Sequence, residues 1–180
     1  MTTKSDSTEG PDLAALWDEH TRCEFETRDP EATIETMVGD NYVNHIPTMT
    51  GGAGTEALRR FYSEFFIPGV PADFETKMIS RTIGEDQLVD EMFTTFTHTV
   101  EIPWMLPGVP PTGRRVEVAV IAIISFRGDK LVHEHIYWDQ ASVLVQVGLL
   151  DLRGLPVAGA ESARKALDRT LPSNEMIEGW

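Results

Sequence analysis

Cysteine, positive charge and long apolar runs are the three features that this sequence has least of. The single cysteine, Cys23, has no partner for an internal disulfide, which fits a reducing compartment. No apolar stretch is long enough to span a bilayer, and the polar segment 1–10 lacks the apolar run of a secretory signal. We therefore expect a cytoplasmic protein with no membrane partner.

Basic residues are scarce as well. The 180 residues include 15 Lys and Arg against 29 Asp and Glu, which gives a formal net charge of -14. Such a surface repels phosphate backbones, so nucleic acid is not expected as a partner. The length suits one ordinary domain with its own core and is short for two.

We predict three parts along the chain. Residues 1–11 are small and polar with nothing to bury, and we expect them to be disordered. Residues 12–152 form the folded domain. The tail, 153–180, contains a short helix with Ala163, Ala166 and Leu167 on one side and has no periodicity after that.

Helical patterns open the domain. Apolar residues recur at helical spacing from Asp12 onward, and His20 on this stripe is interpreted as a residue at the edge of the core. A second helix starts at Asp29 with a proline behind the cap, and Thr55 is the expected cap of a third. Between them, the glycine-rich segment 50–55 lacks the lysine of a phosphate-binding loop, so we expect a flexible loop at a pocket mouth.

The second half of the chain is rich in strands. The strand candidates, joined by turn residues and a Pro-rich connection, are 74–83, 88–100, 115–126 and 131–139. Helices followed by strands predict an α+β domain with the helices on one face of a curved antiparallel sheet. The segment from Val116 to Ile124 is apolar on both faces. We therefore expect helices to cover one face and a second subunit, in a homodimer, to cover the other.

The last strand carries the most chemistry. Alternate side chains of an extended strand share a face, so His133, His135, Tyr137 and Asp139 would line one wall. The opposite face holds Glu134 between apolar residues and is not a clean core face, which favours a site. The alternative is that the four polar residues are the wet face of an antiparallel sheet.

Other segments supply candidate binding residues. His98 ends an otherwise apolar strand face, and the Pro-rich segment 102–113 is apolar enough to close over a ligand. We expect an apolar small molecule to be bound by Tyr42, His45, Met92, Phe96, Trp104, His133 and Tyr137.

Several motifs, taken in order, resemble those of the SnoaL-like polyketide cyclases, in the superfamily named after nuclear transport factor 2. They are Thr97-His98-Thr99, Pro110-Pro111-Thr112-Gly113-Arg114-Arg115-Val116-Glu117, Gly128-Asp129-Lys130-Leu131, and Asp139 followed by Gln146-Val147-Gly148. The resemblance covers roughly residues 12–152. It implies a cone-shaped α+β fold around a deep pocket, commonly dimeric through the sheet.

The resemblance also implies roles for two residues. Asp139 matches the general acid/base of the family, and His98 matches its pocket histidine. The sequence departs from the family in two places. His135 stands where the family usually has tryptophan, and the connection from His98 to Pro110 is longer here.

The chemistry follows from these residue types. Desolvation raises the pKa of a carboxyl group, so Asp139 is a candidate base for a carbon beside a carbonyl, with His98 and His135 polarising that carbonyl. We predict an aldol-type cyclisation or isomerisation of a carbonyl-rich, polyketide-like substrate, without metal or cofactor. Three alternatives stay open: a His-Asp dehydratase, a metal site formed by His133 and His135 with His98 and Asp139, and non-catalytic binding of an apolar ligand.

Overall fold

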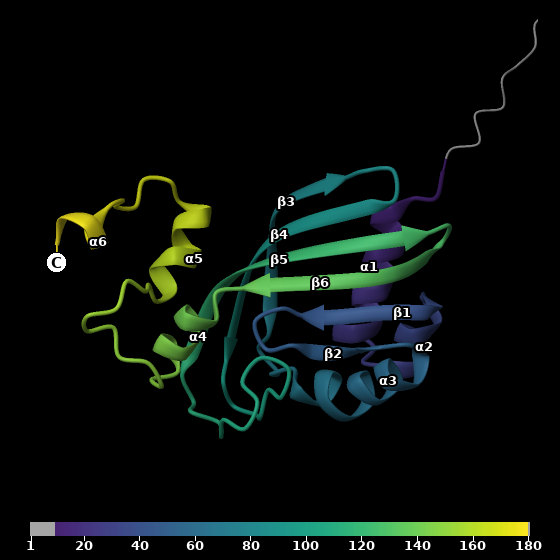
Figure 1. The fold of residues 1–180 in the computed structure, drawn as a ribbon, viewed down its shortest axis with the longest axis horizontal. Helices are drawn as coiled ribbons and strands as arrows, with labels where there is room; N and C mark the ends of the chain where they lie inside the picture. Colours follow the sequence, from purple (N-terminus) through teal and green to yellow (C-terminus); the bar gives the residue numbers. More distant parts are fainter. Residues whose placement is uncertain (1–9, 180) are drawn as a thin grey trace, which may run out of the picture.

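The computed structural model describes residues 10–179, and Figure 1 shows a curved sheet with helices packed against it. The helices are α1 (Leu13–Phe25), α2 (Pro30–Glu35), α3 (Thr55–Arg60), α4 (Gln140–Gln146), α5 (Ala160–Leu167) and α6 (Glu175–Glu178). The strands are β1 (Met37–His45), β2 (Thr50–Ala53), β3 (Glu75–Ile83), β4 (Gln87–Thr97), β5 (Arg115–Arg127) and β6 (Lys130–Trp138). A π-helical turn, η1 (Phe61–Phe66), and a 3-10 turn, η2 (Ile67–Gly69), follow α3. The predicted α+β class is confirmed.

The six strands form one open sheet in the order β2-β1-β6-β5-β4-β3. Neighbouring strands are antiparallel, except that β1 and β6 run parallel. Four of the five neighbouring pairs are thus antiparallel, which confirms the predicted curved antiparallel sheet apart from the one parallel pair. Parallel neighbours need a long crossover, and here the whole chain from β2 to β5 provides it.

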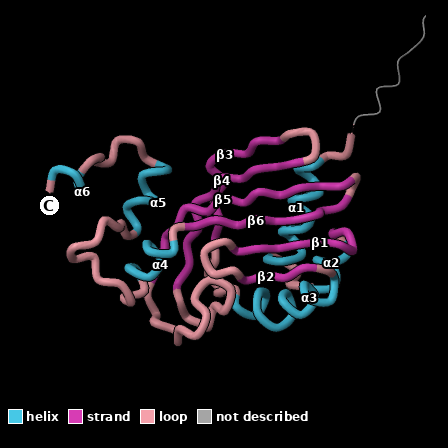
Figure 2. Tube along the Cα trace, viewed as in Figure 1, coloured by secondary structure: helices cyan, strands magenta, loops and turns pink. Residues whose placement is uncertain are grey.

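The inner face of the sheet carries the core. Even-numbered residues of β5 from Val116 to Ile124 are buried, and the residues between them are half-buried. Helix α1 lies across the inner face, where it contacts β4 and β6, and Figure 2 shows it crossing behind the strands. Because side chains alternate along a strand, this placement decides which residues of every strand face the interior.

The four predicted strands agree with β3 to β6 to within three residues at each end. The second helix has Asp29 as its cap, as predicted, and ends at Glu35, because β1 begins at Met37. The glycine-rich segment forms strand β2 rather than a flexible loop, with Thr50 opposite His45. At Gly51, φ is +134° and a Cβ would lie 2.1 Å from the Val43 carbonyl oxygen, so only glycine permits this approach of β2 to β1.

The C-terminal segment lies at one end of the domain. Helix α5 packs against β5 and β4, with Ala163 buried and Arg164 paired with Glu117. The N-terminal segment predicted to be disordered falls, except for its last two residues, outside the described residues. No helix in the described part of the chain is long and apolar enough to cross a membrane.

Candidate active site

A cavity of about 470 Å³ lies between α1, η1 and the inner face of the sheet. Its walls are largely aromatic. The aromatic lining residues are Trp17, Phe25, His45, Phe61, Tyr62, Phe66, Phe74, Trp104 and Trp138. A cavity of this size and composition suits an apolar molecule held by few polar contacts.

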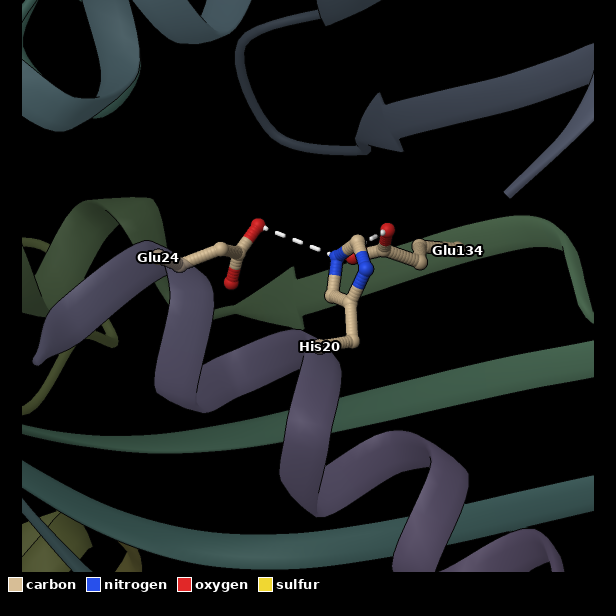
Figure 3. A group of neighbouring side chains, drawn as sticks. All are labelled: His20, Glu24 and Glu134. Carbon is tan, nitrogen blue, oxygen red and sulfur yellow. Dashed lines mark ion pairs between the residues drawn. The ribbon is translucent and has the colours of Figure 1, made fainter. Parts of the chain in front are cut away.

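Three polar residues of the cavity wall, Glu24, Tyr62 and Glu134, surround the buried His20. Figure 3 shows His20 and Glu24, one turn apart on α1, facing Glu134 from the inner face of β6. The Nε2 atom of His20 lies 3.3 Å from Glu24 Oε1 and 3.1 Å from Glu134 Oε1, and all three side chains are buried. The Tyr62 hydroxyl of η1 donates to Glu134 Oε1 at 3.1 Å. Glu24, Tyr62 and Glu134 line the cavity, so this cluster is within reach of a bound molecule.

A hydrogen-bond chain fixes the orientation of the His20 ring. The Thr36 hydroxyl donates to the Thr33 carbonyl oxygen at 2.7 Å, so its oxygen accepts from Nδ1 of His20 at 2.5 Å. With a proton on Nδ1, Nε2 is the ring nitrogen that faces the two carboxylates. Trp17 stacks on the ring with its centroid 5.4 Å away.

The pKa values of His20, Glu24 and Tyr62 in this cluster are all shifted upward. Burial lowers the pKa of His20, but the charges of Glu134 and Glu24 and hydrogen bonds to them outweigh burial and raise the pKa to about 10. Burial raises the pKa of Glu24, although the charge of His20 opposes it. Burial, with the charges of Glu134 and Glu24, raises the pKa of the Tyr62 phenol well above its usual value. A protonated imidazole is therefore buried beside a carboxyl group that retains its own proton more readily than usual.

A third buried acid, Asp90, connects α1 to the sheet. Asp90, on the inner face of β4, accepts hydrogen bonds from Arg81 at 2.7 and 2.9 Å and from Trp17 Nε1 at 2.9 Å. Arg81 also reaches the exposed Asp18 of α1 at 2.9 Å. These contacts hold in place the indole that stacks on His20.

The polar row predicted on β6 faces away from this cavity. His133, His135 and Tyr137 alternate with the cavity-lining Glu134, Ile136 and Trp138, so they lie on the outer face. The rings of His133 and His135 stack at 4.6 Å, and Tyr42 of β1 packs against His135 on the same face. The expectation that this row lines the cavity is therefore wrong, because the helices cover the other face of the strand.

Asp139 lies just after β6 and caps α4. Its Oδ1 accepts hydrogen bonds from the backbone N–H groups of Ala141 and Ser142, and the residue is exposed. It is not among the residues that line the main cavity but borders a second hollow on the outer face. The prediction that Asp139 shares the cavity is wrong. Its catalytic role stays a prediction, and a helix cap explains why an Asp stands there.

The remaining predicted residues divide between cavity and core. His45, Met92 and Trp104 line the cavity, as expected of binding residues, and their contact with a ligand stays a prediction. Phe96 is fully buried and is not part of the lining. His98 is also outside the lining, and its Nδ1 lies 3.1 Å from the Thr112 hydroxyl.

The metal site considered for the outer-face histidines is not assembled. Among residues 10–179, the acidic, histidine and cysteine side chains close enough to hold one metal ion are His20, Glu24 and Glu134, with ligand atoms within 4.8 Å of one another. Neither His133, His135, His98 nor Asp139 belongs to that group.

The motifs that resemble the family hold the scaffold together. Both amide atoms of Gln146 pair with the backbone of Glu117, at 2.8 and 2.9 Å, at a point of β5 that β6 does not reach. Gly148 has a φ of +81°, and a Cβ there would lie 2.2 Å from the guanidinium of Arg114. Backbone pairing thus explains why Gln146 occurs at its position, and close packing explains Gly148.

Sequence reasoning missed His20, Glu24, Tyr62 and Glu134. Two signals were present. His20 and Glu24 are spaced by one helical turn, and Glu134 is an acid on an apolar strand face. An acid on the buried face of a strand needs a partner, and here the partner is an imidazole from a distant helix.

Comparisons with known proteins agree with this architecture. The family model of the SnoaL-like polyketide cyclases matches residues 15–147, and the chain therefore belongs to that family. TsrD from Streptomyces laurentii has a similar structure, with a TM-score of 0.60 at 18% identity, over 78% of this chain and 99% of TsrD. IdmH from Streptomyces antibioticus gives a TM-score of 0.57 at 21% identity, over 75% of this chain and 97% of IdmH. The comparison with curated proteins finds no match.

Proposed function

We propose that the protein is a cyclase-type enzyme that acts on an apolar, carbonyl-rich small molecule bound in the cavity. Membership of the SnoaL-like polyketide cyclase family supports the class of reaction. The observation that carries the proposal is the buried cluster of His20, Glu24, Tyr62 and Glu134 on the wall of an aromatic cavity. Buried acid and base groups with displaced pKa values are typical of catalytic sites.

The cluster provides both halves of a proton transfer. Glu134 takes a proton from the carbon beside a substrate carbonyl, and Glu24 gives a proton to the carbonyl oxygen, so an enol forms. The enol carbon then bonds to a second carbonyl carbon. As the ring closes, the enol oxygen returns its proton to Glu24 and the new alkoxide takes the proton from Glu134. His20 holds the two carboxyl groups together and stabilises the negative charge.

No metal is needed in this scheme, although the three groups are compact enough to ligate one. A proton on Nε2 of His20 already lies between the two carboxylates. The same acid and base would also serve a dehydratase, the alternative that the sequence left open. Activity that persists after treatment with a strong chelator is the expected result. Loss of activity that a divalent ion restores would replace the acid-base scheme with a metal centre.

The proposal is tested with 5-nitrobenzisoxazole, a probe that opens to a coloured phenolate when a base removes its ring proton. We expect the protein to accelerate this reaction and Glu134→Gln to reduce the rate to that of buffer. Glu85→Gln, an exposed acid in a turn, is the matched control and keeps the full rate. Equal rates in the wild-type protein and Glu134→Gln would refute the role of the cluster and favour non-catalytic ligand binding.

The homodimer is also a proposal. The outer face of β5 presents Ala119, Ile121 and Ile123, which are half-buried in the single chain, and the exposed Tyr137 lies beside them on β6. A second copy packed on this face would bury them. Sedimentation velocity of Ile121→Lys should then give a monomer where the wild-type chain gives a dimer, and a wild-type monomer at micromolar concentration would contradict the proposal.

A further inference from the structure

The histidine that lines the cavity itself is in a different chemical state from His20. His45, at the end of β1, is 4% exposed and stands on the inner face of the sheet. The rings around it belong to Phe61, Phe66, Trp104 and Trp138, with centroids 5.5 to 5.7 Å from the imidazole. No carboxylate of residues 10–179 is hydrogen-bonded to His45, in contrast to His20.

Two threonine hydroxyls fix the tautomer of His45. The hydroxyls of Thr48 and Thr50 lie 2.8 and 2.9 Å from the carbonyl oxygen of Trp104, which has two lone pairs and accepts both. The hydroxyl of Thr50 has then used its only proton. The Thr48 and Thr50 hydroxyls also lie 3.1 Å apart. The arrangement with the most hydrogen bonds has the Thr50 oxygen, 3.2 Å from Nδ1 of His45, accept from that nitrogen. Nδ1 therefore carries the ring proton, and Nε2 is an acceptor.

The acceptor is directed into the cavity. Nε2 is the nitrogen at the far end of the ring from the strand, and among the described residues it has no hydrogen-bond partner. Burial lowers the pKa of His45 to about 4, with the charge of Glu134 opposing only in part, so the ring stays neutral near pH 7. Nε2 is not among the fully buried polar atoms that lack a partner, so it keeps access to the cavity, where a bound donor can reach it.

We propose that His45 is a specificity-determining residue that accepts a hydrogen bond from a phenolic or enolic hydroxyl of the bound molecule. Thr50 is its positioning residue. The polar groups of the cavity wall then include both the acid-base cluster of Glu24, Tyr62 and Glu134 and the acceptor at His45. The carbonyl group of the bound molecule rests on the proposed function, whereas the hydroxyl that His45 accepts from does not.

The tautomer is measured directly by ¹⁵N NMR of histidine-labelled protein. We expect the His45 signals to show a protonated Nδ1 and a bare Nε2. Thr50→Val removes the acceptor for Nδ1 and should shift the signals toward the other tautomer. Thr48→Val, which leaves the bond between Thr50 and the Trp104 carbonyl in place, is the matched control. A protonated Nε2 in the wild-type protein would overturn the proposal.

Specificity is measured by calorimetric binding of 2-naphthol and its ether 2-methoxynaphthalene, which lacks the hydroxyl proton. The wild-type protein should prefer the naphthol by about five- to tenfold, the usual net worth of one hydrogen bond. His45→Phe should abolish the preference while the ether still binds, Thr50→Val should reduce it, and Thr48→Val should retain it. Equal wild-type affinities for the two probes would overturn the proposal.

The binding and turnover experiments distinguish a failure of the proposed role of His45 from a failure of the proposed catalysis. A preference for naphthol in a protein that does not turn over 5-nitrobenzisoxazole would support the role of His45 and refute the proposed catalysis. Turnover without that preference would do the reverse. If His45→Phe does not fold, His45→Gln tests the same point with a side chain of similar polarity.

Discussion

His20 and Glu134, from the first helix and the last strand of the domain, meet on the cavity wall with 3.1 Å between Nε2 and Oε1. Glu24 approaches the same nitrogen from the next turn of α1. The pair joins the two ends of the domain and places a buried charge beside the aromatic part of the cavity wall. The contribution of this pair to stability and its role in catalysis are tested by separate measurements.

The alkaline stability of the protein should depend on His20. Its pKa is about 10 in the folded state against 6.5 for an unperturbed histidine. A raised pKa contributes stability that is complete below pH 6.5 and is lost as the pH rises through the folded value. We expect urea unfolding to give a free energy that declines across this window and declines much less in His20→Gln. His135→Gln, on the outer face, should keep the wild-type slope. Parallel curves for the wild-type protein and His20→Gln would disprove the shift.

The two acidic partners of Arg81 should differ in their contribution to stability. Asp90→Ala leaves Nε and Nη2 of the part-buried Arg81 and the N–H of Trp17 without an acceptor, and we expect a loss of about 3–5 kcal/mol. Asp18→Ala removes an exposed partner of the same arginine and should cost at most about 1 kcal/mol. Chemical denaturation of the two variants side by side measures the difference. Similar losses would show that Asp90 does not fasten α1 to the sheet.

Gly148 should be intolerant of any side chain. Gly148→Ala combines the strain of a positive φ with a clash against Arg114, whereas Gly154→Ala has a similar φ of +76° and open space around it. Backbone strain alone costs about 1–2 kcal/mol, so the excess loss in Gly148→Ala measures the clash. Arg114→Ala introduced into Gly148→Ala should recover part of that excess. Equal thermal shifts for the two alanine variants would contradict the close packing.

The sequence predicted the strands well because alternation and turn residues are local signals. It did not predict which face of β6 is the inner one. The alternation of side chains along a strand places His133, His135 and Tyr137 on one face, but it does not show which face the helices cover. The row of reactive side chains on that face suggested a site, although the opposite face holds the single acid. The decisive residue was Glu134, whose apolar neighbours on that face marked it as the buried side.

The cluster itself could be predicted only in part. The spacing of His20 and Glu24 is visible in the sequence, but their contact with Glu134 depends on how α1 crosses the sheet. Strand β2 was missed for a different reason. Its glycines are typical of loops, and only its pairing with β1 explains them.

The role of the cavity is tested most directly by comparing Glu134→Gln with Asp139→Asn under the same conditions. Both changes remove a carboxylate and keep the shape of the side chain. On a carbonyl substrate that the wild-type protein turns over, we expect Glu134→Gln to lose about two to four powers of ten in rate, the usual worth of acid-base catalysis. Asp139→Asn should stay near the wild-type rate, because an Asn also caps α4. Full activity in Glu134→Gln together with an inactive but folded Asp139→Asn would contradict the account and place the chemistry on the outer face.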